Sequence, residues 1–311
     1  PEAGQPVEKD DVENVFAMAV AWSIAAPLQG GDNLTRFYGF LAKTATVSLP
    51  QNPTNHVFDP VLRRWEKWHV PEYVAPSPFK FADIIVPTVD SCKYLHVLNS
   101  LGPKTPVLFC GVSGTAKTTV MNEYLSRLPE DDFARLTLGF SSRTSSSDVL
   151  VSIQANVDKR TGNVFGPPGG KRLVAFVDDM NMPKVDTYGT QQPITFLLTL
   201  ISRGFFYDKK DLTQKVLKDV SYTAAMGPPG GGRNNVDPRF VSLFSLFNLP
   251  EPTDDVLGHI YSSIINTRYR DFAPVVKETA AKFPSFMLEL FSHVVEQLPP
   301  TPSKFFYLFT L

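Results

Sequence analysis

Residues 106–119 read PVLFCGVSGTAKTT, and this stretch decides the fold. The first five residues form a short apolar run typical of a buried strand, and the glycine-rich turn after them leads into a segment with helical spacing. A phosphate-binding loop requires this strand–loop–helix order, because its backbone N–H groups surround phosphate oxygens at the positive end of the helix. We therefore predict that a nucleotide is bound by Gly111, Val112, Ser113, Gly114, Thr115, Ala116, Lys117, Thr118 and Thr119.

Two side chains of this loop have specific expected roles. Lys117 is placed to reach the β- and γ-phosphates, and the Thr118 hydroxyl to ligate Mg²⁺. One position departs from the G-x-x-x-x-G-K-[ST] pattern, because Ala116 stands where the second glycine belongs. The backbone turns sharply there, so alanine fits if its φ stays negative. An ordinary glycine-rich turn before a helix is the alternative interpretation.

A second apolar run, LVAFVDD at 173–179, ends in two acids. This pattern is typical of a Walker B strand, whose first acid, Asp178, would hold the Mg²⁺ shell. Asp179 stands where AAA+ ATPases usually carry the catalytic glutamate that polarises the attacking water. Aspartate is one methylene shorter and the geometry of a general base is strict, so we expect slow hydrolysis or binding without efficient turnover. A solvated strand end is the alternative.

A glycine- and proline-rich loop at 227–235, GPPGGGRNN, follows a further apolar run, and Arg239 comes shortly after it. In AAA+ modules an arginine at this place, before a phenylalanine, acts as a catalytic arginine finger in trans, in the site of the neighbouring module. A surface arginine is the alternative for Arg239, and Arg233 is a second finger candidate. Gly227 stands where a polar sensor residue is usual, which again favours weak hydrolysis; Asn234 is a candidate substitute.

The apolar runs alternate with helical segments, which predicts an α/β fold with a parallel five-stranded sheet and flanking helices, plus helical lid segments. Turn residues predict two exposed hairpins, at 158–171 and 206–220. The proline- and aromatic-rich stretch 50–87 is expected to be an extended, packed connector. Strands are predicted at 106–110, 135–140, 172–178, 220–226 and 241–248, and helices at 12–27, 34–49, 88–101, 117–128, 146–157, 191–204, 236–240, 253–271 and 275–297.

Composition excludes several classes of protein. The 311 residues carry 30 Lys+Arg and 31 Asp+Glu, so no basic field favours nucleic acid as a partner. No apolar run approaches the roughly 18–20 residues of a membrane helix, so we expect no membrane partner. The two cysteines, Cys92 and Cys110, argue against a disulfide scaffold and fit a reducing cytosol. Both ends of the sequence look cut from something longer.

Taken together, the motifs resemble the axonemal dynein heavy chains, and in particular the third AAA+ module of their motor ring. The resemblance covers essentially the whole chain. Its most specific parts are GPPGGGRN and DDMNMPKVDTYG. The stretches that carry it are 83–101 (DIIVPTVDSCKYLHVLNSL), 111–119 (GVSGTAKTT), 158–172 (DKRTGNVFGPPGGKR), 174–194 (VAFVDDMNMPKVDTYGTQQPI), 224–240 (AAMGPPGGGRNNVDPRF) and 301–311 (TPSKFFYLFTL).

The resemblance implies a division of the chain and a set of partners. Residues 1–80 would be the helical lid of the preceding module and a connector, 81–250 the large α/β nucleotide-binding domain, and 251–311 the start of a truncated lid. ATP or ADP with Mg²⁺ would be bound. Partners would be neighbouring AAA+ modules of the same heavy chain, dynein intermediate and light chains and, indirectly, microtubules. The location would be the cytoplasm and cytoskeleton, in the axoneme of a cilium or flagellum.

Three functions are compatible with these residues. The first is a regulatory ATP-binding module of an axonemal dynein motor, which gates the main ATPase and hydrolyses ATP slowly itself. The second is a structural module that holds its nucleotide without hydrolysis, as the departures at Ala116, Asp179 and Gly227 suggest. The third is a free-standing AAA+ remodeller, which the lack of an aromatic pore-loop signal disfavours.

Overall fold

The computed structural model describes residues 8–25, 28, 31–77, 80, 84–208, 212–304, 307 and 309. Its centre is a five-stranded sheet in the order β11-β3-β10-β7-β4, and every neighbouring pair is parallel. The predicted α/β class with a parallel five-stranded sheet is therefore confirmed. The strands are β3 (Val107–Cys110), β4 (Phe133–Gly139), β7 (Arg172–Asp178), β10 (Val220–Met226) and β11 (Ser245–Asn248).

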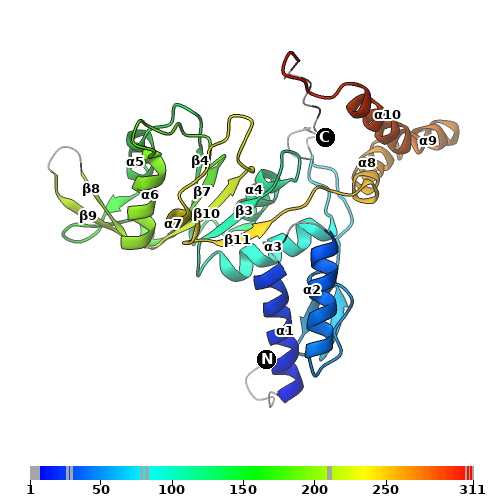
Figure 1. The fold of residues 1–311 in the computed structure, drawn as a ribbon, viewed down its shortest axis with the longest axis horizontal. Coiled ribbons are helices and arrows are strands. Elements are labelled where there is room, and N and C mark those ends of the chain that lie inside the picture. Colours follow the sequence, from blue (N-terminus) through cyan, green and yellow to red (C-terminus); the bar gives the residue numbers. More distant parts are fainter. Residues whose placement is uncertain are drawn as a thin grey trace.

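Helices lie on both faces of this sheet (Figure 1). Residues of α3 and α4 share one buried cluster with the sheet, and residues of α5, α6 and α7 share the other. All five match helices predicted from spacing, although the last strand, β11, begins later than predicted because α7 occupies the residues before it. The bounds are α3 (Val89–Leu101), α4 (Lys117–Arg127), α5 (Ser146–Gln154), α6 (Gln192–Arg203) and α7 (Pro238–Val241).

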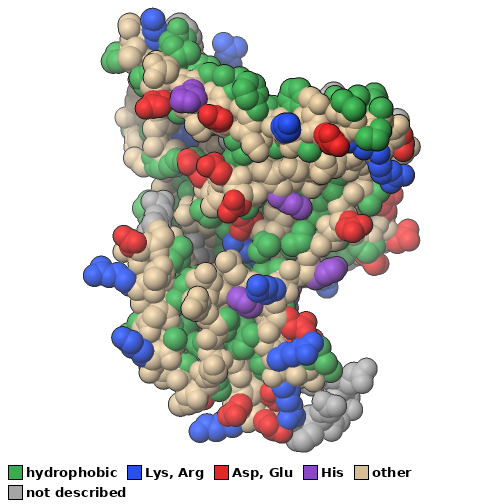
Figure 2. Space-filling model, turned by 90° about the vertical axis from the view of Figure 1, so that its right-hand side faces the viewer, with side chains coloured by type: hydrophobic (Ala, Val, Ile, Leu, Met, Phe, Trp, Pro, Cys, Tyr) green, Lys and Arg blue, Asp and Glu red, His purple; other side chains and the backbone are tan. Residues whose placement is uncertain are grey.

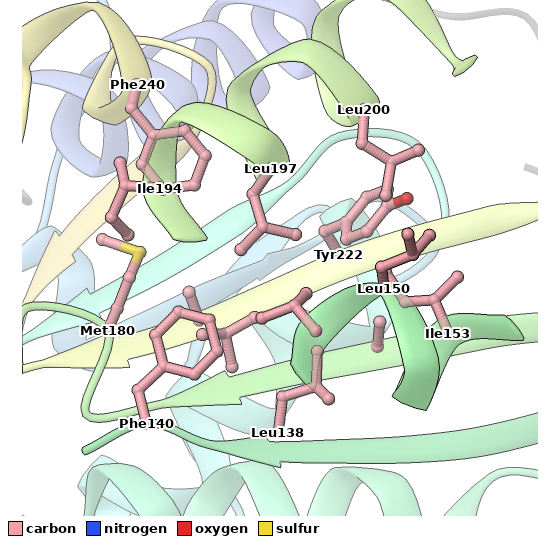
Figure 3. Packing of buried hydrophobic residues seen from close by; sticks show 14 of the residues in the cluster. Leu138, Phe140, Leu150, Ile153, Met180, Ile194, Leu197, Leu200, Tyr222 and Phe240 are labelled. Carbon is pink, nitrogen blue, oxygen red and sulfur yellow. The ribbon is translucent and has the colours of Figure 1, made fainter. Parts of the chain in front are cut away.

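Strand β7 shows why both faces need covering. Leu173, Ala175 and Val177 pack against the helices α5 and α6, whereas Val174 and Phe176 pack in the cluster of α3 and α4. Burial of each aliphatic or aromatic side chain stabilises the fold by about 1.5–3 kcal/mol. Either face of the sheet would therefore be unfavourable if it were exposed to water. Figure 3 shows the cluster on the α5 and α6 face, where side chains of these two helices pack against the sheet. The alternation also directs Asp178 to the α4 side of the sheet, because it has the parity of Phe176.

A second sheet lies at the opposite end of the molecule from the C-terminal helices (Figure 1). The two predicted hairpins form, as β5–β6 and β8–β9, and a parallel pairing of β6 with β9 joins them in the order β5-β6-β9-β8. The turn of the first hairpin has Gly162 at φ +58°. The bounds are β5 (Asp158–Lys159), β6 (Val164–Gly166), β8 (Phe205–Tyr207) and β9 (Gln214–Leu217).

The N-terminal part is a helical pair followed by the packed connector. Trp22 of α1 makes edge contacts with the rings of Tyr94 and Phe247, which ties the pair to the sheet domain. The connector contains an antiparallel hairpin, β1–β2, that was not predicted, and Trp65 of this hairpin donates to Asn14 Oδ1 at 2.7 Å. The bounds are α1 (Lys9–Ala25), α2 (Gly31–Thr44), η1 (Pro53–Asn55), β1 (His56–Asp59) and β2 (Arg64–Lys67).

The C-terminal part is α8 (Asp254–Arg268), α9 (Pro274–Ala280) and α10 (Phe283–Gln297). The prediction of one helix over 275–297 is wrong. The chain breaks between α9 and α10, since Pro284 lacks an N–H and suits the first turn of a new helix. Apolar side chains stay exposed on α9 and α10 (Figure 2). Five residues of the terminal stretch 301–311 lie outside the described residues, and no described helix is long and apolar enough to span a bilayer.

Candidate nucleotide-binding site

The candidate site lies at the carboxyl ends of β3, β7 and β10, the edge at which parallel α/β sheets bind ligands. The phosphate loop joins β3 to α4, as predicted. Its first residue, Gly111, has no room for a side chain, because a Cβ would lie 2.6 Å from Leu249 O and 2.8 Å from Thr115 Oγ1. Thr115 Oγ1 donates to Val112 O at 3.0 Å, which closes the loop on itself.

Ala116 corrects one expectation. Its φ is +58° and its ψ +20°, so it adopts the left-handed conformation of the glycine that it replaces and does not keep a negative φ. A non-glycine residue in this conformation costs about 1–2 kcal/mol. The loop therefore keeps the backbone path of a phosphate loop and carries strain at this residue.

The Lys117 ammonium group points back over the loop. Its Nζ donates to Val112 O at 2.6 Å and to Thr115 Oγ1 at 3.2 Å. Burial lowers the pKa of Lys117, and repulsion from the Arg233 guanidinium adds to this; the carboxylates of Asp178 and Asp179 oppose it. The amine is thus a partly desolvated cation close to both acids, which is the environment expected of a phosphate ligand.

Thr118 and Asp178 meet as predicted. Thr118 Oγ1 donates to the two carboxylate oxygens of Asp178, at 2.9 and 3.1 Å. Asp178 also accepts from the N–H of Asp179 at 3.0 Å. A hydroxyl and a carboxylate are the oxygen ligands that Mg²⁺ uses together with water and substrate phosphates. The pair therefore fits Mg²⁺, whose charge would neutralise phosphate oxygens when both are bound.

Asp179 lies beside this pair but faces Arg233. Its φ is +50°, and its Oδ1 lies 3.4 Å from Arg233 Nη2. Half of the Asp179 side chain is exposed, so the carboxylate borders solvent. The residue at the predicted general-base position thus makes one long contact with an arginine from another loop.

Two further candidates lie elsewhere than the sequence suggested. Arg233, considered as an arginine finger for a neighbouring module, folds into the site of its own module. Asn234, considered as a substitute sensor, donates from Nδ2 to Pro183 O at 2.8 Å and from its backbone to Asn181 O at 2.9 Å. Its amide therefore braces the loop and does not extend toward Lys117.

Sequence reasoning missed Asn181, which is 1% exposed. Its Nδ2 donates to Gly227 O at 2.8 Å and so joins the segment after β7 to the segment after β10. The only signal in the sequence was its position three residues after the first acid. Asn181 fixes the distance between the acidic strand end and the glycine-rich loop.

Arg239 lies apart from this cluster, in the first turn of α7. Its side chain is exposed and makes no ion pair with any residue that the structure describes, and its backbone N–H caps on Asp237 Oδ1 at 2.9 Å. The geometry neither brings it to Lys117 nor tests a role in a neighbouring module.

An apolar cavity of about 220 Å³ adjoins the phosphate loop. It lies between the loop, α3 and α8, and so would offer a nucleotide base an apolar space next to its phosphates. Its walls include Tyr94 of α3, Ala116 and Val120, and Leu257, Ile260 and Tyr261 of α8.

Comparison with known proteins gives a consistent result. The family model described as the P-loop containing dynein motor region matches residues 73–252. The chain is similar to dynein axonemal heavy chain 10 of Homo sapiens, at 42% identity over 99% of this chain. It is also similar to the dynein-1-alpha heavy chain of the flagellar inner arm I1 complex of Chlamydomonas reinhardtii, at 39% identity over 96% of this chain. The chain spans 7% of the length of each of these relatives.

Proposed function

Because the chain belongs to the dynein heavy chains, within their P-loop motor region, we propose that it is a regulatory ATP-binding AAA+ module of an axonemal dynein. In this proposal it is the third module of the motor ring, binds ATP or ADP with Mg²⁺, and gates the motor that drives a cilium or flagellum. Residues 81–250 form its nucleotide-binding domain. Residues 1–80 are the helical lid of the preceding module and a connector, and residues 251–311 are the start of this module's own lid.

The observation that carries the proposal is the convergence of Lys117, Thr118 and Asp178. Two separate segments of sequence meet at one edge of the sheet: residues 111–118, which supply the loop, the lysine and the hydroxyl, and the end of β7, which supplies the carboxylate that pairs with this hydroxyl. Preorganised N–H groups, a cation and Mg²⁺ together stabilise the charge of a triphosphate.

We propose a regulatory role because we expect this module to hydrolyse ATP slowly. A general base must come within about 3 Å of the water proton that it accepts. Asp179 has a shorter side chain than glutamate and is engaged by Arg233 at 3.4 Å. Gly227 offers no polar side chain at the strand tip. Both features favour long-lived nucleotide states, which suit a module that gates the cycle of another.

Partners follow from the same proposal. Neighbouring modules of the heavy chain would contact this one directly, intermediate and light chains would belong to the same motor, and microtubules would be reached only through other parts of the heavy chain. The names of the relatives, axonemal and flagellar inner arm, support a place in the axoneme.

Calorimetric titration of the 311-residue chain with Mg·ATP and Mg·ADP tests the proposal. We expect Lys117→Ala to weaken both titrations by at least about 10-fold, because it removes a charge-assisted bond to phosphate. Lys277→Ala, on the exposed surface of α9, is the matched control and should bind as the wild type does. Equal binding by wild type and Lys117→Ala would reject a nucleotide site here.

The alternative, a structural module that holds nucleotide without hydrolysis, is favoured by the contact between Asp179 and Arg233. Single-turnover mixing of the intact heavy chain with radiolabelled ATP, followed by analysis of the nucleotide retained at this site, separates the two. Slow conversion of ATP to ADP supports the gate. Retention of unchanged ATP over many motor cycles supports the structural module.

A further inference from the structure

The loop after β10 turns Arg233 back onto Gly227. Gly230 and Arg233 exchange two backbone hydrogen bonds, each of 3.0 Å, around a two-residue turn. Both turn residues, Gly231 and Gly232, have positive φ, of +57° and +89°, so the turn requires glycine. The consecutive glycines are therefore the means by which Arg233 is returned to the strand tip.

Arg233 fills the space that a side chain at position 227 would take. A Cβ on Gly227 would lie 2.6 Å from Arg233 Nε and 2.7 Å from Cδ. The polar sensor residue that AAA+ modules usually carry at this strand tip would thus collide with the arginine. The glycine and the arginine are complementary: one removes a polar side chain and the other brings a cation to the same place.

The Arg233 guanidinium has unused hydrogen-bonding capacity. It has five N–H donors. Among the described residues it makes one long contact, of 3.4 Å, to Asp179, and its buried Nε has no partner. An arginine that exists to hold a carboxylate usually forms two parallel bonds of about 2.7–2.9 Å. The present geometry leaves donors for another anion.

The charges near Arg233 also favour a bound anion at this edge of the sheet. Arg233 Nη2 lies 3.4 Å from Asp179 Oδ1, and the Lys117 ammonium group lies over the phosphate loop, donating to Val112 O at 2.6 Å. Two cations that converge on one edge of the sheet are stabilised when a multiply charged anion lies between them. Arg233 lies beside Asp179 and is not among the residues that line the cavity proposed for the base.

We propose that Arg233 contacts the terminal phosphate of the nucleotide bound by its own module, and that it replaces the missing sensor side chain at Gly227. The inference rests on the proposed function, since it requires a nucleotide at Lys117. It makes Arg233 a residue that distinguishes a triphosphate from a diphosphate. The bonds from Asn181 to Gly227 and from Asn234 to Pro183 hold the loop in place, so the arginine is positioned before the nucleotide binds.

The test measures two affinities in the 311-residue chain, by calorimetry with Mg·AMP-PNP and with Mg·ADP. We expect Arg233→Ala to weaken AMP-PNP binding by about 10-fold to 100-fold, the effect of losing a charge-assisted bond, and ADP binding by less than about 3-fold. Gly227→Ala should act in the same direction, since its methyl group displaces the guanidinium while the arginine remains present. Arg36→Ala, on the exposed face of α2, is the matched control.

The outcomes separate the inference from the proposed function. If neither nucleotide binds the wild type, or if Lys117→Ala binds both normally, the proposed function fails. If Lys117→Ala loses both while Arg233→Ala binds both as the wild type does, or loses both equally, only the inference is overturned. Circular dichroism and thermal unfolding without nucleotide establish that each variant folds; if Arg233→Ala does not, the AMP-PNP to ADP ratio of Gly227→Ala decides.

Discussion

Thr118 Oγ1 donates to both carboxylate oxygens of Asp178, at 2.9 and 3.1 Å, across sixty residues of sequence. The alternation of side chains along β7 explains why Asp178 meets Thr118. Val174 and Phe176 face α3 and α4, so the next residue of the same parity, Asp178, is directed toward the first turn of α4. The strand pattern that buries the core therefore also brings the carboxylate that we propose as a Mg²⁺ ligand to the hydroxyl of Thr118.

Thr118→Val should weaken Mg²⁺-dependent nucleotide binding by about 10-fold to 100-fold, the range found when support around a metal is lost. Valine has the shape of threonine but no oxygen ligand, and Thr118 is exposed, so the fold should persist. The measurement is nucleotide affinity with Mg²⁺ and with EDTA.

Thr118→Ser is the control, because it keeps the hydroxyl and should stay close to wild type. The affinity in EDTA should be similar for all three proteins. A Thr118→Val protein whose affinity in Mg²⁺ equals that of the wild type would show that Thr118 holds no metal.

Ala116→Gly should raise the free energy of unfolding by about 1 kcal/mol, because it relieves a left-handed backbone at φ +58°. The alanine methyl is exposed, so little buried area is lost. Urea denaturation without nucleotide gives the number, and an unchanged m value would show that the unfolded state is not altered.

Ala19→Gly is the matched control, since Ala19 is exposed within α1. The same substitution in a helix interior should lower the free energy of unfolding by about 1 kcal/mol. The two variants are expected to shift in opposite directions, and a loss of stability in Ala116→Gly would contradict the strain.

The parallel sheet could be predicted because every strand in it is an apolar run closed by a turn or a helix signal. The joining of the two hairpins could not, because the parallel contact of Val164 with Val216 unites residues far apart in the chain, and no local pattern encodes it. The hairpin at His56–Lys67 was not predicted, because the proline and aromatic residues around it indicated an extended connector. Long-range pairing and tertiary packing override local propensity in such places.

Within the site, the residues that belong to a local sequence motif could be predicted. Lys117, Thr118 and Asp178 follow from a strand–loop–helix motif and an acidic strand end. The φ of Ala116 and the direction of Arg233 were not, because each depends on how loops pack: Arg233 reaches Asp179 only through the turn at Gly231 and Gly232.

Stability should fall as the pH rises above about 9. Burial raises the pKa of Tyr222 and of Tyr94, and it raises the pKa of the Cys110 thiol. The unfolded chain then releases these protons at lower pH than the folded chain, so alkaline pH favours unfolding. Lys117, with its lowered pKa, acts in the opposite direction but is a single group. Urea denaturation at pH 8 and pH 10.5 should differ by about 1 kcal/mol or more.

Tyr222→Phe should reduce this pH dependence, because it keeps the buried ring and removes the titrating hydroxyl. Tyr188→Phe is the control, since its side chain is 91% exposed, and it should leave the dependence unchanged. An equal response of the two variants would show that burial of Tyr222 does not cause the alkaline loss.

Arg239→Ala should leave the unfolding midpoint of this chain and its own affinity for nucleotide unchanged, because the side chain is exposed and lies apart from Lys117.

If Arg239 serves the site of the preceding module, the intact heavy chain should instead lose hydrolysis in that module. An arginine supplied in trans is worth about 10³-fold or more in rate. Arg239→Lys should fail to restore it, because an ammonium group cannot bridge phosphate oxygens with a planar fork. Single-turnover hydrolysis in the intact heavy chain measures this, with Arg36→Ala as control. A normal rate in Arg239→Ala would leave Arg239 as an ordinary surface arginine.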